Sequence, residues 1–252
     1  MKKTTFYLIA LLALMITSIG AMAQPGGLNP LVGSTHKYSV TPGGANTLAW
    51  TVSGSAYSIS GEATQTATIT WTAVGTYTLT FTETNLTTGC KTIKESTIVV
   101  GANTFDVSTS APLSNCNTAT GVPNYSGTTA TTPVTFVINM TTSSTWSPNW
   151  EFTFTLAPSS GSIANVKAGS TSLTAVSGTY KATGLTSAPG TGNGTVNITM
   201  DFTGNITSTN TIDMAITSAK ELQYNTPDRD NTDWTTSQTI NAIPNTTAIT
   251  TD

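Results

Sequence analysis

Charged residues are scarce in this sequence. Only 8 % of its 252 residues are Asp, Glu, Lys or Arg, against about 25 % in a typical globular domain. Loss of Lys2 and Lys3 with an N-terminal leader would leave seven basic and twelve acidic residues, a net charge of −5. Such a surface attracts neither nucleic acid nor an anionic membrane, so we expect neither as a partner.

Histidine is almost absent as well. A Ser-His-Asp triad would have to use His36, the one histidine, which stands at the start of a predicted strand. A zinc site needs several His or Cys ligands, which this sequence does not supply. Most acidic residues stand alone among threonines, which gives little support to a pair of hydrolytic carboxylates. We therefore expect no enzyme and no catalytic residues.

Cysteine occurs only twice, at Cys90 and Cys116, so only one disulfide pairing is possible. Exported compartments permit such bridges. Cys90 lies just before a predicted strand and Cys116 lies in the segment that leaves the next one. A bridge would tie the two halves of the chain together, whereas the alternative is two unpaired, buried thiols. The sequence leaves both possibilities open.

Long apolar runs are lacking except at the N-terminus. Two lysines precede an apolar stretch over residues 6–19, and Ala21-Met22-Ala23 offers a small-x-small cleavage site before Gln24. This pattern predicts a secretory signal peptide over residues 1–23. A membrane anchor fits less well, because the stretch is short for a span. We expect an exported chain at the cell surface or outside the cell, with the periplasm left open, and no membrane span once the leader is removed.

Threonine alternates with large apolar residues throughout the chain. In "ATITWTAVGTYTLTFTET" the even positions hold threonine, apart from Val74, and the large apolar residues stand at odd positions. Alternation with period two places one set of side chains on each face of a strand. Threonine is β-branched, so it favours a strand without adding charge. The break at residues 73–75 predicts a hairpin turn between two strands that share one core.

The same alternation recurs in both halves of the chain, and no convincing amphipathic helix follows the leader. We predict an all-β protein, with two antiparallel, immunoglobulin-like β-sandwich domains after a cleaved signal peptide. The first predicted core contains Trp50, Trp71, Tyr77, Leu79 and Phe81, and the second contains Phe136, Phe152, Phe154, Ile198 and Met200. The predicted segments are the signal peptide (1–23), an N-terminal segment (24–33), the first sandwich (34–102), an extended connection (103–132), the second sandwich (133–240) and a C-terminal tail or edge strand (241–252).

Residues 34–100 resemble the polycystic-kidney-disease-like (PKD-like) immunoglobulin-type domains of exported Bacteroidota proteins. The matching stretches are "YSV", "LAWTV", "ATITWTAVGTYTLTFTETN", Gly89-Cys90 and "STIVV". Where many members read W-D-F-G-D-G, this chain reads "WTVSGS" from Trp50 to Ser55. The resemblance implies a spacer, adhesive or partner-binding module of a cell surface, and it implies no catalysis. The second half of the chain resembles no family in its motifs.

One cluster of carboxylates stands out, in "TPDRDNTDW". The spacing of Asp228, Asp230 and Asp233 lets their oxygens converge on one hard cation, and calcium takes six to eight oxygen ligands from such loops. The alternative is a solvated loop in which Pro227 sets the bend and the aspartates are ordinary turn residues. We therefore treat calcium as a possible cofactor and expect no other.

Two tryptophans, Trp146 and Trp234, could stack on sugar rings if they lay exposed side by side. That arrangement would favour a glycan- or ligand-binding module, with calcium assisting. Separated or buried indoles would favour the other hypothesis, a structural or interaction subunit of an adhesive or filamentous surface assembly. Its partners would be other surface proteins or copies of itself, and residues 241–252 could serve as a donated strand.

Overall fold

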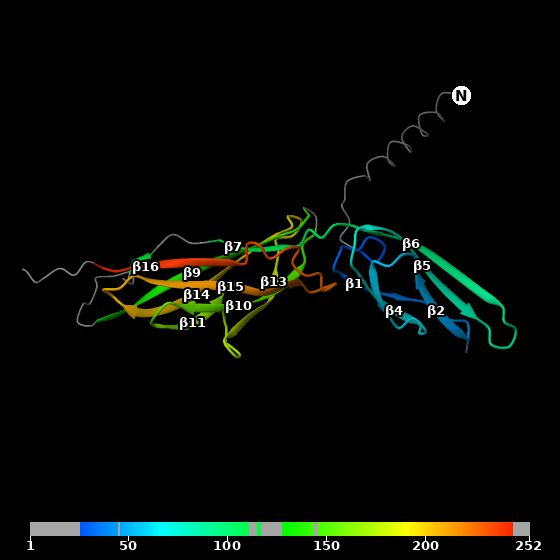
Figure 1. Ribbon diagram of the computed structural model, residues 1–252, viewed down its shortest axis with the longest axis horizontal. Helices are drawn as coiled ribbons and strands as arrows, with labels where there is room; N and C mark the ends of the chain where they lie inside the picture. The colour runs from blue at the N-terminus through cyan, green and yellow to red at the C-terminus, as the bar shows by residue number, and fades with distance from the viewer. Residues whose placement is uncertain (1–25, 45, 111–114, 117–127, 144–145, 244–252) are drawn as a thin grey trace, which may run out of the picture.

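The computed structural model describes residues 26–243, apart from residues 45, 111–114, 117–127 and 144–145. The predicted signal peptide and residues 244–252 lie outside this part. The described residues form sixteen β-strands and no helix, so the all-β prediction is confirmed. Four sheets pair into two sandwiches that lie end to end along the long axis of the molecule (Figure 1). None of the described segments is a helix of the length and apolarity that crossing a bilayer requires.

The first sandwich consists of two three-stranded antiparallel sheets. One has the order β1-β4-β3 and the other β2-β5-β6. The bounds are β1 (Thr35–Ser39), β2 (Thr47–Val52), β3 (Tyr57–Ser60), β4 (Thr66–Trp71), β5 (Gly75–Thr84) and β6 (Lys91–Val100). All five predicted core residues are buried, with Trp71 fully enclosed. The threonines of β5 point the other way, as period two requires.

The predicted hairpin turn at residues 73–75 is wrong. β4 belongs to one sheet and β5 to the facing one, so residues 72–74 cross between sheets, and β5 forms its hairpin with β6. The two facing sheets share one core, and therefore the apolar residues on both sides of the break still meet. The rings of Trp71 and Tyr77 lie 5.0 Å apart between their centroids. Alternation fixes which face of a strand is apolar, but it does not determine which neighbour the strand pairs with.

The second sandwich is larger, with two five-stranded sheets in the orders β12-β11-β14-β9-β7 and β13-β10-β15-β16-β8. The bounds are β7 (Asp106–Ser110), β8 (Asn115–Cys116), β9 (Thr129–Thr141), β10 (Asn149–Pro158), β11 (Ser162–Ala168), β12 (Thr171–Ser172), β13 (Thr179–Thr186), β14 (Asn193–Asn205), β15 (Asn210–Glu221) and β16 (Thr235–Asn241). All pairings are antiparallel except the short parallel contact of β8 with β16. The five predicted core residues are buried here too.

The segment 103–132, expected as an extended connection, contains β7, β8 and the start of β9. Phe105 and Val107 are fully buried in the second core, so the second sandwich begins at about residue 105. These two residues are the only large apolar side chains around β7, and such a short alternation does not reveal a strand. The connection between the sandwiches is therefore only a few residues long.

Candidate functional site

The loop between β15 and β16, residues 222–234, carries the predicted acidic cluster, and a buried carboxylate shapes its first turn. Glu221 ends β15 with its side chain fully buried. It accepts hydrogen bonds from the backbone amides of Gln223, Tyr224 and Thr226 at 2.6 to 2.8 Å, and from the Thr226 hydroxyl at 2.8 Å. Such charge-assisted bonds are stronger than neutral ones. They fold the loop back sharply and set the position of Tyr224.

The carboxylates that converge are Asp106, Asp228 and Asp230, which offer oxygens within 4.8 Å of one another. Asp228 and Asp230 are two of the three predicted ligands. Asp106 comes from the start of β7 and takes the place expected for Asp233. The backbone carbonyl of Asp233 instead accepts a hydrogen bond from the amide of Thr109. No local spacing could have indicated Asp106, because it is brought in by strand packing.

A positive charge already lies in this cluster. The Arg229 Nε atom is 3.1 Å from a carboxylate oxygen of Asp106 and 3.1 Å from one of Asp230. Burial raises the pKa of Asp228 to about 7, against the opposing effect of hydrogen bonds from the amides of Val107 and Asp230. A cation would therefore compete with Arg229 and, near neutral pH, with a proton on Asp228.

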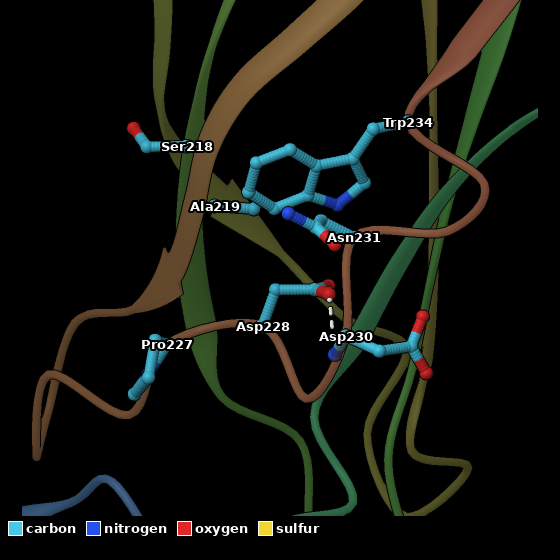
Figure 2. Close-up of a pocket in the computed structure, with 7 residues that line it drawn as sticks. All are labelled: Ser218, Ala219, Pro227, Asp228, Asp230, Asn231 and Trp234. Carbon is cyan, nitrogen blue, oxygen red and sulfur yellow. Dashed lines mark hydrogen bonds between the residues drawn. The ribbon is translucent and has the colours of Figure 1, made fainter.

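A cavity of about 370 Å³ opens beside these carboxylates (Figure 2). Its lining residues are Ser218, Ala219, Pro227, Asp228, Asp230, Asn231 and Trp234. Figure 2 shows the Trp234 indole above Asn231, with the Asp228 carboxylate pointing into the same space and the Asp230 carboxylate turned away. The Trp234 Nε1 atom is buried and has no hydrogen-bond partner. The cavity thus offers an apolar ring, an amide and a carboxylate on one side of the loop.

Trp146 does not share this cavity. It is 1 % exposed and packs in the second core, while Trp234 is only partly buried against the same core. The Trp146 backbone is fixed from both sides, because its amide donates to Ser143 and its carbonyl accepts from the Thr142 hydroxyl. The two indoles therefore do not lie exposed side by side, which was the condition for their stacking on a sugar as a pair. This is the arrangement that favours a structural or interaction role.

The cysteines are neither bonded nor buried. Cys90 and Cys116 are both free and exposed, so neither of the two expected arrangements occurs. Cys90 lies at the tip of the β5–β6 hairpin, and Cys116 pairs with Asn241 at the end of β16. Figure 1 places these two points at opposite ends of the long axis. A disulfide needs Cα atoms within about 7 Å, which this arrangement excludes.

The same loop also holds the two sandwiches together. The amide of Thr35 donates to the carbonyl of Tyr224 at 2.8 Å, and the Asn103 side chain donates to the carbonyl of Pro227 at 2.8 Å. The His36 ring stacks on the Tyr224 ring, with centroids 4.3 Å apart. We call these contacts of residues 33–36 and 103 with residues 224–227 the junction.

His36 is the central residue of the junction. It is 4 % exposed, and its Nε2 atom lies 2.9 Å from the Ser34 hydroxyl. Burial lowers the pKa of His36 to about 4, so the ring is neutral at physiological pH. The sequence pattern places His36 at the start of a strand but does not reveal its contact with Tyr224, since nothing local connects residues so far apart in the chain.

Comparisons with known proteins identify no family. No protein-family model matches the chain, and no curated protein does. Among solved structures, a chimeric titin Z1Z2 is 10 % identical, with 86 % of this chain and 92 % of that chain covered and a TM-score of 0.35.

Two further solved structures are similarly distant. The D00-D0 domain of intimin is 14 % identical, with 88 % and 97 % covered and a TM-score of 0.25. A protein of unknown function from Porphyromonas gingivalis W83 is 10 % identical, with 84 % and 92 % covered and a TM-score of 0.29. Likenesses this distant carry no argument about function.

Proposed function

We propose that this chain is an exported, non-catalytic structural or interaction protein that serves as a spacer or subunit of a bacterial cell-surface assembly. The observation that carries the proposal is the junction. A short connection joins the two sandwiches. The loop between β15 and β16 also holds them together, because its Tyr224 carbonyl accepts a hydrogen bond from Thr35 of β1. A spacer must keep its two ends at a fixed separation. Several directional contacts at the junction would hold the two sandwiches in one relative orientation and so keep the ends apart.

The fit of the junction is close at Gly33. Its φ is +86°, a conformation that disfavours any side chain, and a Cβ atom placed there would lie 2.8 Å from Cδ of Pro227. The backbone of the first sandwich therefore lies directly against the loop of the second. Such contact restricts bending between the two sandwiches, whereas tandem domains without a large interface are expected to move relative to each other.

Two further features support a place in a surface assembly. Residues 34–100 resemble PKD-like modules, which are typical of exported surface proteins. Scarce charge leaves few of the lysines that usually protect sheet edges from pairing, although the edge strand β6 carries two of them, Lys91 and Lys94. Partners would be other surface proteins or further copies of this chain.

Small-angle scattering of the mature chain tests the spacer. We expect a narrow distribution of lengths for the wild type and a broad one for Tyr224→Ala, which removes the ring stacked on His36. Tyr180→Ala is the matched control, because Tyr180 stacks on Phe154 inside the second sandwich. A wild-type chain as flexible as Tyr224→Ala would rule out a rigid spacer.

A second candidate is calcium-assisted binding of a glycan or another small ligand. It is favoured by the three converging carboxylates beside the cavity that Trp234 and Asn231 line. Trp234 would then be the one indole available to a sugar ring. Titration calorimetry with calcium alone, and then with oligosaccharides in the presence of calcium, tests this function. Absence of a binding heat in both titrations would rule it out.

A further inference from the structure

The first sandwich is open on one side. A constant-type immunoglobulin sandwich has seven strands, whereas the described residues of this one form six. Between β1 and the sheet of β2, β5 and β6 lies a groove of about 290 Å³. Trp50, Leu79 and Phe81 contribute its apolar surface, and Lys37 and Lys94 flank it. The groove therefore lies beside the edge strand β6, whose residues Lys94 and Ser96 line it.

The outer edge of β6 borders this groove and is only partly covered. Near its end, the amides of Val99 and Gly101 donate to the carbonyls of Leu28 and Pro30 at 2.9 and 2.8 Å. Because the backbone alternates, the amides of Ile93, Glu95 and Thr97 face the same side as that of Val99. Among the described residues, no strand pairs with them on that side, and every side chain from Lys91 to Thr97 is exposed.

We propose that this edge accepts residues 245–252 of a second copy of the chain as an added antiparallel strand. The inference rests on the proposed role in an assembly and names the contact through which copies would join. Main-chain hydrogen bonds supply the affinity in such strand addition, and side chains at alternate positions supply the specificity. The segment "NTTAITTD" has eight residues and faces the eight residues from Lys91 to Ile98.

One register places the isoleucine of the segment on the groove side and its aspartate opposite a lysine. With Asp252 opposite Lys91, Ile249 stands opposite Lys94, whose partner on β5 is Phe81. Residues opposite each other in an antiparallel pair share a face, so Ile249 lies on the groove side. Asp252 is the only charged residue of the segment, and it meets a lysine on the other face.

The donor must be another copy because the segment cannot reach its own groove. β16 runs away from the first sandwich, and its end lies at the far end of the molecule (Figure 1). The thirteen-residue strands β9 and β14 of the intervening sandwich span about 43 Å at roughly 3.3 Å per residue. The ten residues from Ile243 to Asp252 extend at most about 35 Å. Donation from copy to copy is head-to-tail, and such contacts generate open rows or fibres unless the rotation closes a ring.

Light scattering of the mature chain and peptide binding test the proposal together. We expect the wild-type chain to form assemblies that grow with concentration, and the chain lacking residues 244–252 to remain monomeric. A labelled peptide of residues 243–252 should bind the shortened chain. Thr97→Pro removes an amide that faces the free edge and leaves the β5 side of the ladder intact. It should weaken the peptide about tenfold, which corresponds to about 1.4 kcal/mol, while the control Thr97→Ala should leave binding within about twofold.

A charge exchange checks the register without relying on proline. Lys91→Glu should weaken the wild-type peptide about fivefold, and a peptide with Asp252→Lys should recover that loss. Equal binding by wild type, Thr97→Pro and Lys91→Glu would overturn the proposal, as would a full-length chain that is monomeric at every concentration. If copies associate but the peptide does not bind, this contact is wrong, while the proposed assembly role and its scattering test stand.

Discussion

The two sandwiches differ in how completely they are closed. The second has five strands in each sheet and the first has three. Of the described residues, the first core buries fewer than half as many hydrophobic side chains as the second. A smaller unit buries a smaller fraction of its surface and is less stable. The comparison teaches that the second sandwich should be the more stable unit, while the first combines a smaller core with an edge strand that no described strand covers along its whole length.

The largest expected effect comes from the smaller core. Trp71→Ala should destabilise the first sandwich by about 3–5 kcal/mol, because it opens a cavity where the indole is fully buried. Calorimetry should show a much lower Tm for the unfolding transition of the first sandwich and little change in the Tm of the second.

Phe152→Ala should do the reverse, since Phe152 is fully buried in the second core. Thr78→Ala, on the exposed face of β5, should cost less than about 0.5 kcal/mol. One shared transition that moves equally in both core variants would show that the sandwiches are not separate units.

Acid should weaken the first sandwich through His36. Burial holds its pKa at about 4 in the folded protein, below the ordinary 6.5. The unfolded chain therefore binds more protons between these values, and the stability contributed by the neutral ring is present above pH 6.5 and lost as the pH falls to 4. The loss from this one group is about 3 kcal/mol.

Urea unfolding at several pH values measures this loss. The facing groups are the Ser34 hydroxyl and the Tyr38 and Tyr224 rings, and none of them is charged in this range. A His36→Gln variant should lack this component of the pH dependence. If the free energy of unfolding falls equally steeply with pH in wild type and variant between pH 6.5 and 4, the assignment to His36 is contradicted.

Gly33→Ala should cost about 1–3 kcal/mol, because the added methyl group meets Pro227 and the backbone conformation is strained. The first sandwich should melt earlier, and scattering should show a broader range of lengths. Adding Pro227→Ala should restore part of the lost stability, because it makes room for the new methyl group. The part of the loss that comes from the strained backbone conformation at residue 33 should remain. No recovery in the double variant would mean that the two residues do not meet.

Calcium should have the smallest effect. At a free concentration equal to its Kd, a bound ion would raise the stability of the second sandwich by only about 0.4 kcal/mol. Because the pKa of Asp228 is about 7, binding should be weaker at pH 6 than at pH 8. Asp228→Asn should abolish the shift in Tm, and Asp233→Asn should keep it. Identical melting curves in calcium and chelator would leave Arg229 as the only cation of the cluster.

Alternation in the sequence was sufficient for the fold class and for both cores, because the period of a strand is local. Trp71 and Phe152 could be placed on an apolar face from their neighbours alone. Pairing is not local, and so the 73–75 break was mistaken for a hairpin. The same limit explains why Asp106 was missed beside Asp228 and why Tyr224 was missed beside His36. The burial of Trp146 could not be predicted, because it depends on backbone hydrogen bonds with Ser143 and Thr142 that the sequence pattern does not show.

The position of the docking loop along the chain has a consequence for biosynthesis. Every residue of the first sandwich precedes Gly101, whereas the groups that grip it, Tyr224 and Pro227, are made more than a hundred residues later. Chains grow from the N-terminus, and domains generally fold as units while they emerge. The first sandwich therefore folds before the junction exists, while its orientation relative to the rest of the chain is still unrestricted. The junction can form only after β15 has paired and Glu221 has folded the loop, so the contacts between the sandwiches are among the last that the growing chain acquires.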